Sequence, residues 1–222
     1  FALLNLDSIG EKYPEFGLPA GVVDSQGIRE GIVYPLLGAR VTHPLFNGFL
    51  LRYLFSAEII RKARISFEGA YLEDELFLME YFCNAETLAV TDQPLYRYVI
   101  NPASATHQYM KDFLKVLRRF MERKEALVQK YHLEEARPQW RETSNWAGLL
   151  IAIGNEYARG NEKSVRQKQK AVQELCATPE MKKAIEEITP VGMTGNKQMV
   201  AQLVKGGHFF ILTQLYRLKN RI

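Results

Sequence analysis

Apolar residues recur at helical spacing through most of the second half of the chain. Between residues 107 and 131 they stand three or four positions apart, which is the repeat of an amphipathic helix and predicts a helix capped by Thr106. Start signals predict further helices that begin at Pro138, behind a cap at Asn161, at Thr178-Pro179-Glu180 and behind a cap at Asn196, the last interrupted at Gly206-Gly207. No strand-like alternation follows residue 107, so this part is expected to be a helical bundle.

Residues 1–106 show a different pattern, in which short apolar runs alternate with turns rich in glycine and proline. Short strands are predicted over 1–8, 21–24, 51–55, 87–90 and 95–100. A helix is predicted over 27–37, capped by Asp24 or Ser25 and ended by Gly38, and a helical turn is predicted to start at Ser56. The expected fold class is α+β and predominantly α, with a strand-containing front at 1–106 and an all-helical extension at 107–222.

Three acidic residues stand in a row at positions 73–75, directly before an apolar series at helical spacing. They are therefore expected to open a helix that packs one face inward. The N-terminus of a helix stabilises an anion by about 0.3–1 kcal/mol, so a carboxylate there is ready to accept a proton. Spacing alone leaves two interpretations open, namely acids that only complement the helix dipole or a general base beside a cleft.

The composition is that of a globular protein, with 222 residues, 47% hydrophobic and 24% charged. Two cysteines, Cys83 and Cys176, lack the spacing of a zinc site and are expected to be buried thiols in a reducing compartment. No apolar run reaches the roughly 18 residues that a membrane-spanning helix needs. No secretory signal precedes the first elements, so a cytoplasmic location is expected.

Three segments together resemble a known family. Residues 66–77 read Ser-Phe-Glu-Gly-Ala-Tyr-Leu-Glu-Asp-Glu-Leu-Phe, residues 93–98 read Gln-Pro-Leu-Tyr-Arg-Tyr, and residues 101–106 read Asn-Pro-Ala-Ser-Ala-Thr. In order and spacing they resemble the C-terminal half of bacterial family 2 glycosyltransferases, which have the GT-A fold. That family carries an apolar-Phe-x-x-x-x-x-Glu-Asp-x-x-Phe segment, a Pro-Leu-Tyr-x-Tyr strand and a Ser-containing loop. The resemblance covers about residues 45–108 and implies a partial GT-A-like front.

The resemblance implies transfer of a sugar, with inversion, from a nucleotide-sugar donor to a glycan or lipid-linked acceptor, as in bacterial surface polysaccharide synthesis. Such a reaction needs a base for the acceptor hydroxyl and neutralisation of the diphosphate leaving group. By the resemblance, Asp74 is the general base, Glu73 orients the acceptor and Glu75 is solvated. Further candidates are, for acceptor binding, Tyr96, Tyr98 and Ser104 and, for the donor phosphate or a metal, Arg97 and His107. Core packing of the two tyrosines and a surface position for His107 stay open as alternatives.

The family binds a divalent metal, Mn or Mg, through an Asp-x-Asp motif that this sequence does not contain. Asp7 is the nearest match, but Ser8, Ile9 and Gly10 follow it where further acids would stand. The donor-binding half with its metal motif is therefore expected upstream of Phe1, and the chain by itself is expected to be incomplete for activity.

The C-terminal end is basic although the net charge of the whole chain is only +4. Residues 196–222 contain no acid and five cations, namely Lys197, Lys205, Arg217, Lys219 and Arg221. One interpretation is a final helix docked on the bundle, with its cations complementing its own dipole. The other is that 207–222 binds an anionic membrane surface and places the protein peripherally at the inner face of the membrane. No nucleic-acid motif is present, so nucleic acid is not an expected partner.

A second class of function stays open beside the transferase. Residues 107–222 could form a non-catalytic helical module that binds another protein, with the front an inactive remnant that lacks a donor-binding half. Sequence upstream of Phe1 would discriminate the two, because an alternating strand and helix pattern with an Asp-x-Asp motif would favour the enzyme.

Overall fold

The computed structural model describes residues 7–8, 11–12, 17–42, 48–67, 69, 72–93, 95–96, 108–189 and 195–220. Helices make up most of these residues, and short antiparallel strands complete them. The fold is therefore α+β and predominantly α, as predicted.

A strand and a long helical segment open the front. β3 (Gly21–Asp24) leads into α1 (Ser25–Ile28), a π-helical turn η1 (Arg29–Val33) and α2 (Tyr34–Thr42) without a break. The predicted cap is confirmed, because Asp24 Oδ1 accepts a hydrogen bond from the Gly27 amide at 2.9 Å. The predicted end at Gly38 is wrong. A Cβ on Gly38 would lie 2.9 Å from Thr143, so this glycine lets two helices approach closely rather than ending one.

The described strands form two separate pairs. β4 (Thr87–Val90) runs antiparallel to β3, with Asp24 opposite Thr87, which confirms both predicted strands. β1 (Asp7–Ser8) pairs with β2 (Glu11–Lys12), and the rest of the strand predicted over 1–8 lies outside the described residues. Of the strand predicted over 95–100, only Leu95 and Tyr96 are described, with Tyr96 in an isolated bridge.

The strand predicted over 51–55 is wrong. Its place is taken by a single 3₁₀ turn, η2 (Leu50–Arg52), after which α3 (Ala57–Ala63) begins behind Ser56 as predicted. The aromatic residues of this segment pack against a helix instead of joining a strand ladder: Tyr53 lies edge-on to Phe82 at 4.9 Å between ring centroids. Apart from an isolated β-bridge at Tyr53, the aromatic residues here pack against a helix and form no strand.

The acidic run opens α4 (Glu73–Cys83), as predicted. The helix is buried round most of its circumference, and not on one face alone, because η1, α3 and α5 (Phe113–Lys130) all pack against it. Its buried residues are Glu75, Leu76, Phe77, Leu78, Met79, Tyr81 and Phe82. α4 is thus the central helix of the front.

The second half consists of α5, α6 (Trp140–Glu156), α7 (Val165–Cys176), α8 (Pro179–Glu187), α9 (Gly195–Lys205) and α10 (Phe209–Asn220). The start of α8 at the Thr178-Pro179 signal is confirmed. The predicted break between the last two helices is also confirmed, since Gly207 has a φ of 68°, which favours glycine. No strand occurs among the described residues after 110, in agreement with the predicted helical extension.

Three predicted helix starts in this half are wrong. α9 begins at Gly195, so Asn196 lies inside this helix and does not cap it. α5 begins at Phe113 and not near 107, because residues 108–110 are held against the end of α6: the Met110 amide donates to Asn155 Oδ1 at 2.8 Å, and Asn155 Nδ2 donates to Met110 O at 2.9 Å. Asn161 does not cap α7. Ser164 does so in a capping box with Gln167, while Asn161 Nδ2 donates to Glu156 O at 2.6 Å.

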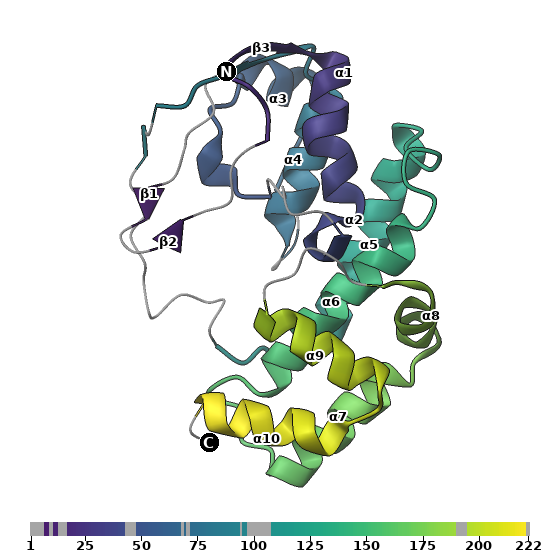
Figure 1. Cartoon of the computed structure of the whole chain (residues 1–222). Coiled ribbons are helices and arrows are strands. Elements are labelled where there is room, and N and C mark those ends of the chain that lie inside the picture. Colours follow the sequence, from purple (N-terminus) through teal and green to yellow (C-terminus); the bar gives the residue numbers. More distant parts are fainter. Residues whose placement is uncertain are drawn as a thin grey trace.

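α6 is the central helix of the second half and contacts α2, α5, α7, α8 and α9. α5 and α6 approach closely at Gly148, where a Cβ would lie 2.6 Å from Leu117 of α5. In Figure 1 the strands and α1–α4 lie in the upper part, α5 and α6 run through the middle, and α7, α9 and α10 lie at the lower end. One hydrophobic core joins the two parts. Among the described residues, no helix has the length and apolar character needed to cross a bilayer.

Candidate functional site

The start of α4 has an unusual backbone conformation. Leu72, at the N-cap position, has φ 63° and ψ 11°, which is the left-handed region. A bulky residue pays about 1–3 kcal/mol for such a conformation, and it persists only where the surroundings enforce it. Glu73 and Asp74 follow directly, both half-buried in the first turn. Two carboxylates therefore stand at the positive end of a helix whose entry is held under strain.

The third acid of the run, Glu75, corrects the sequence prediction. It was expected to be solvated, but only 6% of it is exposed. Its Oε1 accepts a hydrogen bond from Lys124 Nζ at 2.7 Å, and the same Nζ donates to Leu36 O at 2.7 Å. Lys124, on α5, is 1% exposed. The third position of α4 points between α2 and α5, so the carboxylate enters the protein with a cation beside it.

This buried ion pair lies at a junction of four helices. A cavity of about 20 Å³ beside it, large enough for one water molecule, is lined by residues of α2, α5 and α6 as well as by Leu72 and Glu75. Ser144 of α6 donates its hydroxyl to Leu37 O of α2 at 2.9 Å. The ion pair thus ties the start of α4 to α5, and the two hydrogen bonds to backbone oxygens tie α5 and α6 to α2.

Aromatic rings form the other side of the α4 start. Phe67 stacks on Phe77, with ring centroids 4.3 Å apart and planes 6° apart, yet Phe67 remains 54% exposed. Gly69 lies close to the acids, because a Cβ on it would be 3.9 Å from Glu73 Cβ. One face of the Phe67 ring is covered by Phe77, and the exposed part of Phe67 offers apolar surface two residues before Gly69.

The other predicted site residues are placed in part. Tyr96 is 39% exposed and is not a core residue. Arg97, Tyr98, Ser104 and His107 lie outside the described residues, so their predicted roles stay predictions. No group of three or more His, Cys, Asp or Glu side chains in the described part of the chain could hold a metal ion.

The two thiols do not add a nucleophile. Burial raises the pKa of both Cys83 and Cys176 to about 12, so both are protonated near neutral pH. Cys176 is buried as predicted, and Cys83 is half-buried.

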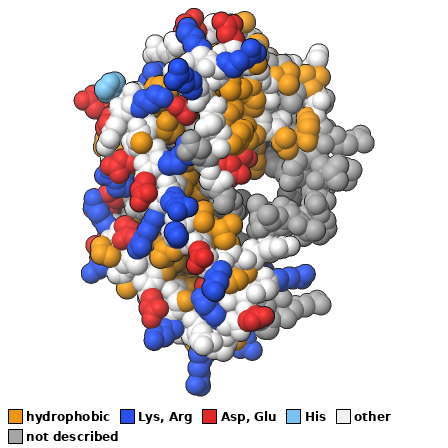
Figure 2. Space-filling view, turned by 180° about the vertical axis from the view of Figure 1, so that it is seen from behind, with side chains coloured by type: hydrophobic (Ala, Val, Ile, Leu, Met, Phe, Trp, Pro, Cys, Tyr) orange, Lys and Arg blue, Asp and Glu red, His pale blue; other side chains and the backbone are white. Residues whose placement is uncertain are grey.

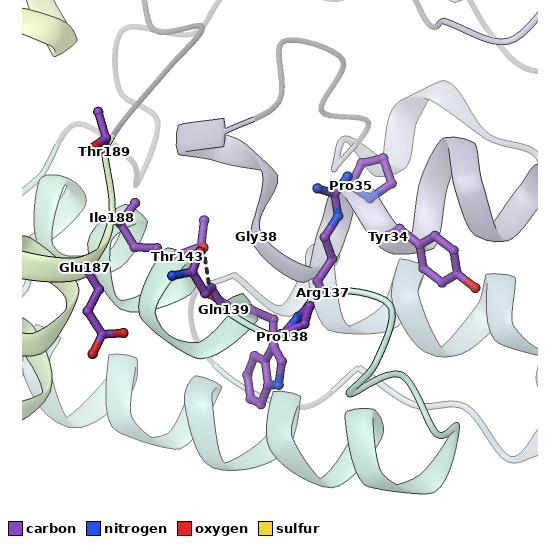
Figure 3. A pocket seen from close by; sticks show the side chains of 11 residues that line it. Tyr34, Pro35, Gly38, Arg137, Pro138, Gln139, Thr143, Glu187, Ile188 and Thr189 are labelled. Atoms are coloured by element: carbon purple, nitrogen blue, oxygen red, sulfur yellow. Dashed lines mark hydrogen bonds between the residues drawn. The ribbon is translucent and has the colours of Figure 1, made fainter.

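A larger cavity lies elsewhere, between α2, the start of α6 and the end of α8 (Figure 3). Its volume is about 380 Å³, and it is not lined by Glu73 or Asp74. In Figure 3 Glu187 lies at the left of the lining and Tyr34 at the right, with Arg137 between them, and Thr143 Oγ1 donates to Gln139 O at 2.7 Å. Gly38 lines both this cavity and the small one beside Glu75. The large cavity brings no pair of carboxylates together, so the start of α4 is the better candidate for chemistry.

Comparison with known proteins finds no matching family model, no similar curated protein and no similar solved structure. The function must therefore be argued from the residues and their geometry.

Proposed function

We propose that this chain is the acceptor-side part of an inverting, nucleotide-sugar-dependent glycosyltransferase of GT-A type, and that Asp74 is its general base. The observation that supports this most is the start of α4, where Glu73 and Asp74 are half-buried at a helix N-terminus that strain and a buried ion pair hold in place. Fixed side chains are what a catalytic base requires, because a displacement of 1 Å can cost a hundredfold in rate.

In the proposed reaction the acceptor hydroxyl attacks the anomeric carbon of the donor sugar. Its oxygen forms the new glycosidic bond, the bond from carbon to the diphosphate oxygen breaks, and the hydroxyl proton passes to an Asp74 carboxylate oxygen. Glu73 hydrogen-bonds the acceptor and orients it. The N-terminal dipole of α4 favours the charged form of the base before the transfer.

The exposed face of Phe67 supports the same assignment. The C–H face of a sugar ring is apolar and packs well on an aromatic ring. Phe67 precedes Gly69 by two residues, and Gly69 approaches Glu73. Phe67 then fixes the plane of the acceptor sugar while Glu73 fixes its rotation in that plane.

The diphosphate and its divalent metal belong to the donor side of such an enzyme, for which the described residues offer no metal-binding group. Arg97 and His107 are proposed to contact the diphosphate. The proposed setting is the cytoplasmic face of a bacterial membrane, where nucleotide sugars meet lipid-linked acceptors.

The test is sugar transfer by the full protein that the gene encodes, measured as nucleoside diphosphate release with a panel of nucleotide sugars and glycan or lipid-linked acceptors. Asp74→Asn should keep the fold and lower turnover by at least about a hundredfold, the low end for general base catalysis. Glu58→Gln is the matched control, because Glu58 is an exposed acid in the first turn of α3. Near-normal turnover by Asp74→Asn would show that Asp74 is not the general base. If the wild type releases no nucleoside diphosphate from any donor, the proposal of a glycosyltransferase is wrong.

A further inference from the structure

The last helix, α10, has an apolar face that points away from the protein. Phe210 is 65% exposed, Ile211 52% and Leu218 81%. With 100° between successive residues, these three side chains, together with Gln214 and Arg217, fall within an arc of about 120°. Single exposed apolar residues are common on protein surfaces, but several on one arc of a helix form a contiguous apolar patch.

The opposite arc of α10 already has a partner. Leu212 and Thr213 are 0% exposed, Thr213 Oγ1 lies 2.7 Å from Tyr157 Oη, and Tyr216 stacks on Tyr157 with ring centroids 4.7 Å apart. Burial raises the pKa of Tyr216 to about 12. The inner arc holds the helix on the bundle as predicted, so fold stability does not require the outer apolar side chains.

The charged side chains of α10 and of the segment before it have a single sign. Residues 188–222 contain no acid. Lys205, Arg217 and Lys219 are all exposed, and none of them forms an ion pair with any residue of the described chain. Arg217 donates to Gln214 Oε1 at 3.0 Å, which keeps the guanidinium beside the apolar side chains. Figure 2, which views the molecule from behind, shows Lys and Arg side chains projecting from the lower end with Asp and Glu side chains among them; Figure 1 places α7 and α10 at this end.

We infer that the outer face of α10 binds the surface of an anionic lipid bilayer. Phe210, Ile211 and Leu218 enter the boundary between headgroups and acyl chains, and Arg217, Lys219 and Lys205 lie at the level of the phosphates. An interfacial helix combines an apolar arc with flanking cations in this way, and long basic side chains can extend from its edges to the headgroups. The attachment does not depend on whether the protein transfers sugars.

The test is co-sedimentation of the full protein with vesicles of phosphatidylcholine, with or without about a third of phosphatidylglycerol, at low and high salt. The wild type should bind the anionic vesicles at low salt, bind less at high salt and ignore the neutral ones. The double variant Phe210→Ser/Leu218→Ser should bind at least about tenfold more weakly, since burying each apolar side chain is worth that much. Arg217→Gln and Lys219→Gln should each cost about fivefold at low salt.

Val22→Ser is the matched control, because Val22 is 79% exposed on β3, at the other end of the molecule in Figure 1, and should leave binding unchanged. Circular dichroism and thermal unfolding check that each variant is folded. Failure of the wild type to bind anionic vesicles at low salt, or equal binding by the double variant, overturns the inference. If the wild type instead forms a dimer in sedimentation velocity that the double variant converts to a monomer, a second copy covers this face and the membrane assignment is wrong. The vesicles contain neither sugar donor nor acceptor, so none of these outcomes depends on the proposed function.

Discussion

The start of α4 and the outer face of α10 differ in how far their charged and apolar side chains are exposed to solvent. At the start of α4, a carboxylate and an ammonium group are buried together, with Glu75 6% and Lys124 1% exposed. On α10, cations and apolar side chains both face the solvent, with Leu218 81% exposed. Desolvated charges contribute to the native state only while their partners are in place, whereas exposed groups contribute almost nothing to it. The first region is built for fixed geometry and the second for contact with something outside the chain.

The largest expected effect follows from breaking the buried pair. Lys124→Met removes the cation from a buried carboxylate and should lower the free energy of unfolding by about 3–5 kcal/mol, measured by urea denaturation. The double variant Glu75→Gln/Lys124→Met should recover part of that loss, because no charge then remains in the site. Lys115→Met is the control, since Lys115 is exposed on the same helix. Equal losses from Lys124→Met and Lys115→Met would contradict the contrast between the two regions.

Part of this buried pair could have been read from the sequence. The buried residues of α5 include Phe113, Leu117, Phe120, Lys124 and Leu127, which stand three or four positions apart. A single lysine in an apolar stripe signals a buried cation, and it requires an acid among the residues that face it. The prediction missed it because the apolar residues alone were used to define the helix face. Which acid pairs with Lys124 could not be predicted, because the two residues are 49 positions apart and meet only in the folded protein.

The same limit explains the other errors. Local sequence signals predicted helix starts correctly where neighbouring residues determine them, as at the Asp24 cap and the Thr178-Pro179 start. They failed where tertiary contacts decide: Gly38 continues its helix because Thr143 lies against it, and α5 starts late because Asn155 holds Met110. The acidic start of α4 was predicted in place and type. The strained conformation of Leu72 was not, since nothing in an apolar residue type indicates a left-handed backbone.

A smaller loss of stability is expected from breaking an ion pair in which one partner is buried and the other is exposed. Glu142 of α6 is 7% exposed, while its partner Lys183 on α8 is an exposed lysine with 58% of its side chain accessible. Burial of Glu142 alone would raise its pKa, but the hydrogen bond from Lys183, a backbone hydrogen bond and the charges of Lys183 and Arg141 together outweigh burial, and the net shift of the pKa is downward. A lowered carboxyl pKa stabilises the fold above the ordinary Glu pKa of about 4.3, and this contribution is lost as pH falls through the folded value.

Lys183→Met should therefore lower the free energy of unfolding at pH 7, by less than Lys124→Met does. The difference from the wild type should shrink as the pH falls below about 4.3 and the carboxyl becomes protonated in both proteins. Urea denaturation at a series of pH values measures it. A difference that stays constant down to the acid limit would mean that Lys183 acts through packing of its stem and not through its charge.

The smallest effect is expected where the chain exposes the most apolar surface. In the absence of lipid, Phe210→Ser and Leu218→Ser should each change the free energy of unfolding by no more than about 0.5 kcal/mol, because both side chains are already in water in the native state. Leu212→Ala on the inner arc of the same helix is the contrast: Leu212 is 0% exposed, and its truncation should cost about 2–5 kcal/mol. Denaturant unfolding of the three variants in the same buffer compares them directly. If the outer substitutions cost as much as the inner one, the chain itself covers Phe210 and Leu218 in solution, and the outer arc would have nothing left with which to bind a membrane.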